Sequence, residues 1–505
     1  MEAHEFREAA KAAIDEMTDY TENVAEHRVV SNVKPGYLRP LLPSSAPTDP
    51  EPWSTIHHDI ETKILPGITH WSSPRFMAFF PCASSYPAAL AEIYSNAFNG
   101  AHFNWICSPT VTELETIVMD WLAQALGLPE CYLSGGSTHG GGVIHGSASE
   151  GILVNMVAAR DKYLAAMTSH LPPGSEEKED ALWNHRSKLV ALGSSGTHSS
   201  TKKVAQVLGV RFVAIPVSEA DGFALQGDAL AATIKNLRAR GLKPFFLTAT
   251  LGTTDVCAVD DFDGIVQALK PTFDTAQDIW VHVDAAYAGS ALVLEENKHL
   301  AKAFSSFHSF SFSPHKWFLT TFDCTAVWVR HRAWLIQALS IKPPYLRNQF
   351  SDDELVTDYR DWQIQLGRRF RSLKLWFVMR SYGISGLQKH IRNGIDLAES
   401  LEAKINSRRD LFSIFTPARF GLVTLRVKGE SEQQINARTE AVYEAINAAG
   451  EFFLTATAVN DKFAIRVCTS VTKVEEEHVQ RVFDVLVDTT KAEIAKGRKG
   501  LECYL

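Results

Sequence analysis

The stretch IWVHVDAA, residues 279–286, is a short apolar run that contains an aspartate near its end. Four similar runs, rich in Val, Ile and Phe, lie between residues 188 and 330: KLVALGS (188–194), RFVAIPV (211–217), FFLTATLG (245–252) and CTAVWVR (324–330). Helix-period segments such as 110–126 and 150–166 belong to the same region. Strands of this composition, spaced by helices, predict a mainly parallel sheet covered on both faces. We therefore expect an α/β fold.

The polar residues that end these runs are the first candidates for a functional site. In an open α/β sheet, ligands bind beyond the carboxyl ends of the strands. Thr253 and Thr254 follow one run, Asp284 ends another, and a segment with Lys316 precedes the last one. These positions are where a bound ligand is expected.

The composition is that of an ordinary globular protein. The 505 residues include 45% hydrophobic and 21% charged residues, and the net charge of −8 gives no reason to expect a nucleic-acid partner. Seven scattered cysteines form no C-x-x-C pair, and no N-x-[S/T] acceptor occurs. The N-terminus has no apolar core typical of a signal peptide, and no uncharged run reaches membrane-spanning length. A cytoplasmic protein with reduced thiols is expected.

The chain is expected to have three parts. Residues 1–85 are interpreted as a helical arm, with a helix over 5–30 and a Pro-rich connector over 33–53. Such an arm has little surface of its own to bury, so we expect it to wrap another domain or another subunit. Residues 86–385 would form the large α/β domain, and residues 386–505 a small α+β domain.

Lys316 lies in the stretch HSFSFSPHKWFLTTFDC (308–324), among phenylalanines and a tryptophan. A lysine in such surroundings can lay its stem on apolar surface and keep its ammonium group in water. Alternatively, an amine removed from water has a lowered pKa and becomes a nucleophile that can form a Schiff base. The stretch alone leaves both interpretations open.

A glycine-rich stretch, LSGGSTHGGGVIHGSASEG (133–151), is a candidate anion site. A dinucleotide fingerprint fails because His145 stands where the third glycine would fall, and no G-K-[ST] of a phosphate-binding loop occurs. Ser147 and Glu150 have the spacing of a capping box that opens a helix. The pattern indicates either a plain helix cap or a phosphate bound at the helix N-terminus.

Asp284 ends a strand that is otherwise apolar, and a buried carboxylate is costly unless it is paired. It could form a structural salt bridge, bind a metal ion, or hold a proton on a ring nitrogen. No cluster with metal-ligand spacing lies nearby, so no metal is expected. Pyridoxal phosphate (PLP) requires an anion cradle, an acid partner and a lysine, and these occur here along the chain in the order Ser147–Ser149, Asp284 and Lys316.

Several motifs resemble those of the aromatic L-amino acid decarboxylases, which are group II PLP enzymes. They are FFPCASSYPA (79–88), SPTVTELETIVMDWL (108–122), GGGVIHGSASEG (140–151), HVDAAYAGSA (282–291), SPHKWF (313–318) and PPYLRNQ (343–349). The resemblance covers about residues 20–400. It implies the fold of the aspartate aminotransferase type: an N-terminal arm, a large domain with a mainly parallel seven-stranded sheet, a small C-terminal domain, and an intertwined homodimer.

The resemblance also implies roles for individual residues. Lys316 would form the Schiff base with PLP, and Asp284 would pair with the pyridine nitrogen. The remaining contacts to the cofactor would come from Ala148 and Ser149 at the phosphate, Ala286 and His198 on the two sides of the ring, and Thr254, Ser313 and His315 nearby. Ser313 departs from the family, which usually has Asn there, and this bears on cofactor affinity.

Tyr345 lies on a loop that closes over the site in the family and returns a proton to the substrate carbon. Relatives with Phe at this position tend to release an aldehyde and ammonia, so Tyr345 together with His198 favours simple decarboxylation. The alternatives are an aromatic aldehyde synthase and a non-catalytic scaffold of the same fold.

By the same resemblance, the substrate is a small aromatic amino acid, and the slot that binds its side chain combines aromatic and small residues. They are Trp71, Phe79, Phe80, Pro81, Cys82, Ala101, Phe103 and Gly367. Cys82 replaces a common Thr and Ala101 a bulkier Ile, which indicates a different slot from that of the animal enzymes.

Overall fold

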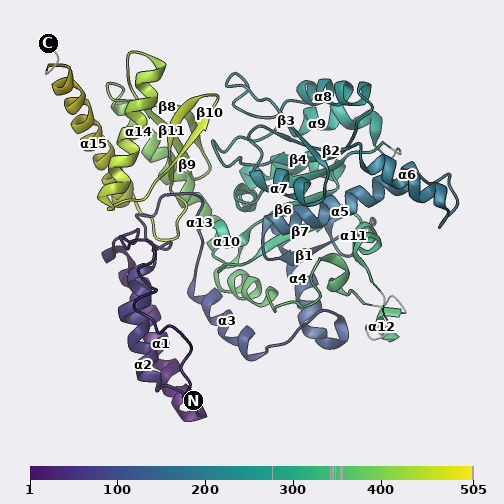
Figure 1. Cartoon of the computed structure of the whole chain (residues 1–505), viewed down its shortest axis with the longest axis horizontal. Helices are drawn as coiled ribbons and strands as arrows, with labels where there is room; N and C mark the ends of the chain where they lie inside the picture. Colours follow the sequence, from purple (N-terminus) through teal and green to yellow (C-terminus); the bar gives the residue numbers. More distant parts are fainter. Residues whose placement is uncertain are drawn as a thin grey trace. The chain divides into compact units, whose positions relative to one another are not determined.

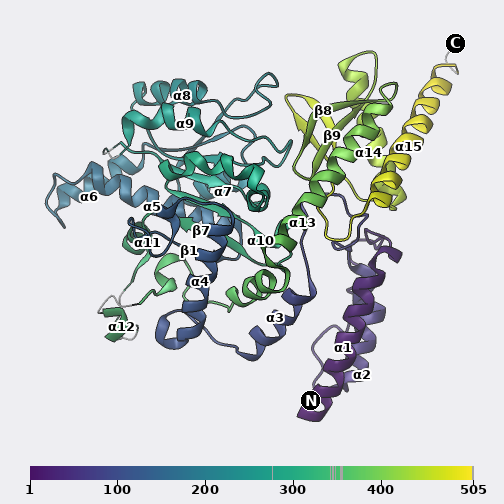
Figure 2. The ribbon, with the colours of Figure 1, turned by 180° about the vertical axis from the view of Figure 1, so that it is seen from behind.

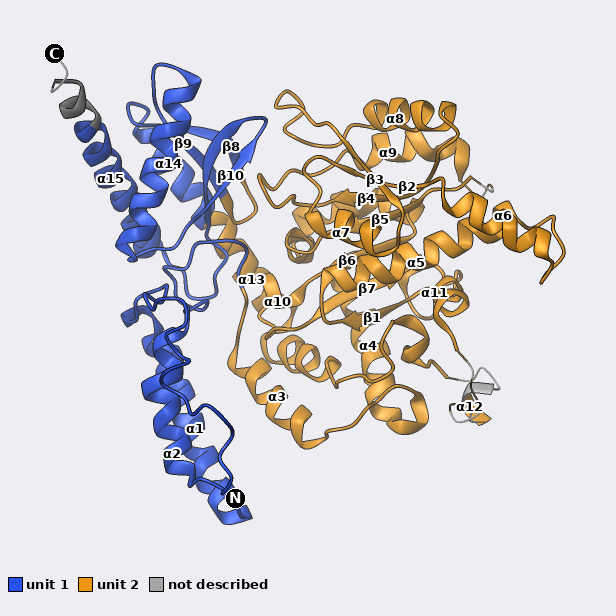
Figure 3. Ribbon diagram, viewed as in Figure 1, with its two compact units in different colours: residues 1–81, 397–417, 423–505 blue, residues 82–396, 418–422 orange. Residues whose placement is uncertain are grey.

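The computed structural model describes residues 1–273, 275, 277–341, 343, 346, 349–352 and 356–502. The chain divides into two compact units (Figure 3). Residues 1–81, 397–417 and 423–505 form unit 1, and residues 82–396 and 418–422 form unit 2. Each unit is described below by itself.

Unit 2 is built on a seven-stranded sheet in the order β1-β7-β6-β5-β4-β2-β3 (Figure 1). The strands are β1 (Gly141–His145), β2 (Leu189–Ser194), β3 (Arg211–Ile215), β4 (Lys243–Thr250), β5 (Trp280–Asp284), β6 (Ser309–Phe312) and β7 (Thr325–Val329). Pairing from β6 to β3 is parallel, and only β7 runs against both of its neighbours. The predicted α/β fold with a mainly parallel sheet is confirmed.

Two of these strands, β1 and β6, are absent from the five apolar runs in the sequence. β1 lies inside the glycine-rich stretch, and β6 has the sequence SFSF. Both are fully buried: β1 lies beside β7, from a distant part of the chain, and β6 lies between β5 and β7. Their pairing partners rather than their own composition make them strands, because β propensity depends strongly on context.

Helices flank the sheet of unit 2, as Figure 2 shows from behind. They are α3 (Tyr86–Ala97), α4 (Pro109–Ala125), α5 (Ala148–Met167), α6 (Glu176–Arg186), α7 (Ser199–Val207), α8 (Gly227–Ala239), α9 (Phe262–Leu269), α10 (Pro314–Trp317), α11 (Arg332–Leu339) and α12 (Gln349–Asp352). β2 and β5 are buried along their whole length, as expected for strands covered on both faces.

One core cluster of unit 2 lies between α5 and the sheet. Ile152 and Met156 of α5 pack in one cluster with Phe246 of β4, Trp280 of β5 and Val327 of β7. The first turn of α5 is thereby held beside the central strands. This position matters because Ser147, the N-cap of α5, belongs to the predicted anion site.

Unit 1 combines the N-terminal arm with the C-terminal part of the chain. Its helices are α1 (Ala3–Asn23), α2 (Trp53–Asp59), α14 (Glu432–Ala449) and α15 (Glu476–Glu502), and α13 (Ser372–Ser407) enters it from unit 2. A four-stranded sheet has the order β10-β11-β9-β8, with β8 (Phe412–Arg419), β9 (Leu422–Val427), β10 (Thr455–Val459) and β11 (Lys462–Cys468).

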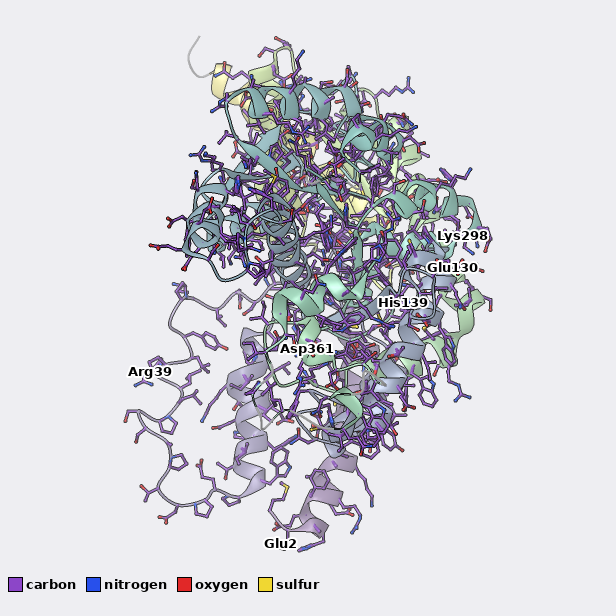
Figure 4. All side chains as sticks on the ribbon, turned by 90° about the vertical axis from the view of Figure 1, so that its right-hand side faces the viewer. Glu2, Arg39, Glu130, His139, Lys298 and Asp361 are labelled. Atoms are coloured by element: carbon purple, nitrogen blue, oxygen red, sulfur yellow. The ribbon has the colours of Figure 1, made fainter. Side chains whose placement is uncertain are left out.

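The arm is tied to the C-terminal part of unit 1 by hydrogen bonds. Lys473 Nζ donates to the carbonyl of Thr21 (2.7 Å), and Arg28 Nη1 donates to the carbonyl of Ala449 (3.1 Å). The connector over 33–52 contains neither helix nor strand, and Arg39 lies on this open loop (Figure 4). None of the helices in the described residues is long and apolar enough to cross a membrane.

Candidate active site

Lys316 lies on α10, a single helical turn between β6 and β7. The backbone N–H of Ser313, the N-cap of this turn, donates to the carbonyl of Ala286 just beyond β5 (3.0 Å). The carbonyl of His315 accepts from the N–H of Ala83 (2.7 Å). These bonds hold the lysine at the carboxyl end of the parallel strands.

Lys316 is half-buried as a residue, and its amine lies in a packed environment near two groups that can be negatively charged. Burial lowers its pKa, while the charges of Asp284 and Cys82 act in the opposite direction. Lys316 in turn opposes the rise that burial causes in the pKa of the Cys82 thiol. A desolvated amine next to a carboxylate favours the nucleophilic interpretation over a lysine that extends into water.

Asp284 is the buried last residue of β5. It stands in register between Thr250 of β4 and Ser311 of β6. Its Oδ1 accepts from the N–H of Ala286 (3.0 Å), and its carbonyl accepts from the N–H of Leu251 (3.0 Å). The carboxylate is thus oriented by the backbone N–H of Ala286, while the main chain of Asp284 is bonded to the residue that follows β4.

The N-terminus of α5 forms the predicted helix cap with one difference. Ser147 Oγ accepts from the N–H of Glu150 (3.2 Å), as expected. Glu150 Oε2, however, accepts from the N–H of Gly146 (2.9 Å), one residue before the N-cap. Ala148 is half-buried and Ser149 is exposed at the first turn, so an anion can approach their N–H groups.

Glu150 is held ionised beside this turn. Burial raises the pKa of its carboxyl, but hydrogen bonds from His145, Gln365 and the N–H of Gly146, with the charge of His145, lower it to about 2. The carboxylate therefore stays charged near the positive end of the α5 dipole, where a negative charge is stabilised.

Sequence reasoning missed an ion pair at the same turn. Arg371 Nη2 donates to Asp323 Oδ2 (3.2 Å). A Cβ built on Gly146 would lie 2.9 Å from that oxygen and 3.6 Å from Arg371 Nη2, so both side chains border the anion site. The pair joins residues far apart in the chain, and no local pattern in the sequence indicates it.

Ser313 and His315 connect α10 to the start of β7 through side-chain hydrogen bonds. Ser313 Oγ is hydrogen-bonded to Thr325 Oγ1 of β7 (2.9 Å). His315 Nδ1 accepts from the N–H of Cys324 (2.9 Å), and burial followed by the positive charge of Lys316 lowers the His315 pKa to about 4. His315 is therefore neutral at physiological pH and serves as a hydrogen-bond acceptor.

His198 and Thr254 lie at the carboxyl ends of β2 and β4. His198 caps α7: its Nδ1 accepts from the N–H of Ser200 (3.2 Å), which leaves the proton on Nε2. Thr254 follows Thr253, whose Oγ1 accepts from the N–H of Ala258 (2.9 Å) and closes the turn after β4. Because β2, β4, β5 and β6 are parallel, His198, Thr254, Asp284 and Lys316 all belong to one edge of the sheet.

The residues predicted for the substrate slot are found in both units, and each group is described by itself. Trp71, Phe79, Phe80 and Pro81 belong to unit 1. Trp71 stacks on Phe79 with ring centroids 5.7 Å apart, and Arg466 lies over the ring of Phe80 (5.3 Å). Phe79 has a positive φ of 51°. Its side chain is 47% exposed, so the aromatic cluster leaves part of the Phe79 ring accessible to solvent.

The other four slot residues belong to unit 2. Cys82 interacts electrostatically with Lys316. Ala101 and Gly367 are exposed, and the carbonyl of Phe103 accepts from the N–H of Arg360 (3.1 Å). Within the described residues, no interaction joins these three to Lys316, and Tyr345 lies outside the described residues.

Comparisons with known proteins agree with this arrangement. The family model "Pyridoxal-dependent decarboxylase conserved domain" matches residues 35–428. An aromatic-L-amino-acid decarboxylase of Bos taurus is 45% identical over 96% of this chain and 96% of its own length. A phenylacetaldehyde synthase of a Rosa hybrid cultivar is 40% identical over 97% of this chain and 95% of its own length. The crystal structure of Oryza sativa TDC with PLP and tryptamine, 35% identical, superposes with a TM-score of 0.91 over 97% of this chain and 99% of that one.

The residues of the site fit PLP. The desolvated amine of Lys316 can bind an aldehyde, the Asp284 carboxylate can face a ring nitrogen, and the open first turn of α5 can hold a phosphate. The chain belongs to the pyridoxal-dependent decarboxylase family and is a PLP-dependent enzyme of the carboxy-lyase type.

Proposed function

We propose that the enzyme decarboxylates aromatic L-amino acids to arylalkylamines and CO2. The substrate class comprises tryptophan, 5-hydroxytryptophan, tyrosine, DOPA and phenylalanine. The observation that carries the proposal is the placement of Lys316 beside Asp284 at the carboxyl edge of the sheet. The relatives named above, with aromatic amino acids or amines in their names, support the substrate class.

Bound PLP supplies the electron sink for the electron pair left behind when CO2 departs. Lys316 holds the cofactor through its ε-amine, and burial favours the neutral, nucleophilic form of that amine. Asp284 holds the proton on the ring nitrogen, which keeps the sink effective. The N–H groups of Ala148 and Ser149 fix the phosphate, and His198 lies against the ring with a proton on Nε2.

Tyr345 is proposed to return the proton to the substrate carbon, with His198 assisting. A second candidate function is decarboxylation with oxidative deamination, in which O2 is reduced to hydrogen peroxide and the amino acid yields an aldehyde, CO2 and ammonia; the 40% identical phenylacetaldehyde synthase supports it. The test is to incubate the purified enzyme with PLP and the five amino acids, and to measure amine, CO2, aldehyde, ammonia and hydrogen peroxide. Amine with CO2 is expected from wild type. Aldehyde with ammonia and peroxide from wild type would establish the synthase instead.

Tyr345→Phe tests the role of this residue directly. The variant is expected to divert the reaction toward aldehyde, because the phenyl ring cannot donate a proton. A variant that forms only amine at the wild-type rate would remove Tyr345 from the mechanism. A wild-type protein that forms no product with any of the five substrates would support a non-catalytic scaffold.

We also propose that the enzyme is a homodimer. Leu90, Ile93 and Tyr94 of α3 are each 47% exposed, and Phe98 after the helix is 55% exposed. A grouped apolar surface of this kind is typical of an interaction site. Light scattering after gel filtration should give twice the chain mass for wild type and for the control Glu179→Gln. Leu90→Glu should shift the population toward monomer, and a wild-type monomer would refute the proposal.

A cytoplasmic location is proposed on the basis of the free cysteines. Four cysteines in the described part of the chain, Cys82, Cys107, Cys131 and Cys324, are free thiols, and three of them (Cys82, Cys107 and Cys131) are exposed or half-buried. Such thiols persist in a reducing compartment. Fractionation of cells that express the full chain should recover the enzyme with cytosolic markers; recovery in a secretory or membrane fraction would contradict the proposal.

A further inference from the structure

A row of four polar side chains crosses from β5 to β6 beneath the site. Trp280 and His282 belong to β5, and Ser309 and Ser311 belong to β6. Trp280 Nε1 donates to Ser309 Oγ (2.8 Å), and Ser309 Oγ lies 2.8 Å from His282 Nδ1. His282 Nε2 lies 3.1 Å from Ser311 Oγ. Each of the four residues is buried.

The hydrogen positions in this row follow from the chemistry of its first member. An indole N–H can only donate, so Ser309 Oγ accepts from Trp280. In the part of the chain that the structure describes, the only other partner of Ser309 Oγ is His282 Nδ1. The buried Ser309 hydroxyl hydrogen therefore goes to Nδ1, since a buried donor without an acceptor is costly. His282 carries its proton on Nε2 and donates it to Ser311 Oγ.

His282 is neutral at physiological pH. Burial lowers the pKa of its imidazole to about 4, although the charge of Asp284 acts in the opposite direction. The imidazole therefore contributes a fixed dipole and no net charge. Its N–H end points along the row toward Ser311, which stands in register beside Asp284.

We propose that His282 is a positioning residue whose Nε2–H, oriented by Trp280 and Ser309, acts through Ser311 to keep the Asp284 carboxylate ionised. The donors of the row all point one way, so its positive end lies at Ser311, which stands in register with Asp284, and positive charge near a carboxylate favours the charged form. An ionised Asp284 then keeps the cofactor ring nitrogen protonated. This inference rests on the proposed pairing of Asp284 with that nitrogen.

The experiment measures the protonation of the cofactor ring nitrogen and does not depend on the reaction rate. Holoenzyme without substrate is prepared with PLP labelled with ¹⁵N in its ring, and the chemical shift reports whether the nitrogen is protonated at pH 7.5. The PLP dissociation constant is measured in parallel. His282→Leu removes the donor, and His282→Gln keeps an N–H that can reach Ser311. His308→Gln is the control, because His308 is also buried but lies before β6, at the amino end of the strand, and pairs with Asp278.

Wild type, His282→Gln and His308→Gln are expected to show a protonated nitrogen. His282→Leu is expected to lower the ratio of protonated to unprotonated nitrogen about tenfold, which corresponds to one pKa unit. Ser311→Ala, which keeps the imidazole, should also lower the ratio of protonated to unprotonated nitrogen. This variant replaces His282→Leu in the test if His282→Leu does not fold. A protonated signal in both His282→Leu and Ser311→Ala, or an equal loss in His308→Gln, would overturn the inference.

Asp284→Asn separates this inference from the proposed function. If Asp284→Asn leaves the nitrogen protonated, the proposed role of Asp284 is wrong, and the inference fails with it. If Asp284→Asn abolishes the protonated signal while the His282 and Ser311 variants keep it, only the inference fails.

Discussion

The Lys316 amine and the Asp284 carboxylate act on each other across the ends of two neighbouring strands. Burial lowers the lysine pKa, and the carboxylate raises it. The backbone bond from Ser313 N–H to the Ala286 carbonyl (3.0 Å) joins the segments that carry them. The protonation state of the nucleophile therefore depends on a residue that is itself assigned to the cofactor.

Replacing Lys316 should abolish both covalent cofactor binding and turnover. We expect Lys316→Ala to lose the visible band of the holoenzyme and to reduce decarboxylation by at least about a thousandfold, because no other amine takes its position. Borohydride reduction followed by peptide mass spectrometry checks the attachment site. The control Lys302→Ala, at an exposed position, should carry the reduced cofactor on Lys316 as wild type does. A label on another lysine in the wild-type enzyme would contradict the assignment.

Removing the charge of Asp284 should lower the pKa of Lys316 further. Asp284→Asn eliminates the carboxylate that favours the ammonium form, so the neutral amine should persist to lower pH. The measurement is the pH dependence of reductive methylation at Lys316 in the enzyme without cofactor. Asp263→Asn, an exposed change on α9, is the matched control. An unchanged or higher midpoint in Asp284→Asn would show that the two groups are not coupled.

Glu150 should stabilise the fold in a pH-dependent way. Its pKa is lowered from 4.5 to about 2 in the folded enzyme. The stabilisation, on the order of 2–3 kcal/mol, is therefore complete above the unfolded pKa and is lost as the pH falls toward 2. Glu150→Gln should melt at a lower temperature than wild type at pH 7.

The difference in melting temperature between wild type and Glu150→Gln should shrink as the pH is lowered from 6 to 3. Glu179→Gln, at an exposed position of α6, should melt like wild type throughout. A difference that stays constant with pH would assign the effect of Glu150→Gln to packing instead of charge.

Gly289 should not tolerate a side chain. A Cβ at this position would lie 2.4 Å from the Cβ of Phe312 in β6 and 3.1 Å from that of Ala285. We expect Gly289→Ala to destabilise the enzyme by about 1–3 kcal/mol through overpacking. Gly135→Ala, where a Cβ meets nothing within 4 Å, is the control. Thermal denaturation compares the two, and equal melting temperatures would refute the packing argument.

The sequence alone determined the class of fold and the chemical types in the site. Apolar runs separated by helices predict the parallel sheet, because burial on both faces requires continuous apolar composition. Asp284 at a strand end, Lys316 in an apolar stretch and Ser147 before a helix are each visible locally. The motifs around them led to PLP and to the decarboxylase family, both of which the comparisons confirm.

Only the tertiary structure decided which of these groups act on one another. β1 becomes a strand through pairing with β7, which is distant in the chain, and the row from Trp280 to Ser311 exists only because β5 and β6 pair in one particular register. A shift of one residue would turn both serines of β6 to the other face of the sheet. Register and strand order are set by non-local pairing, so the coupling of Lys316 to Asp284, and of His282 to Ser311, cannot be read from local patterns.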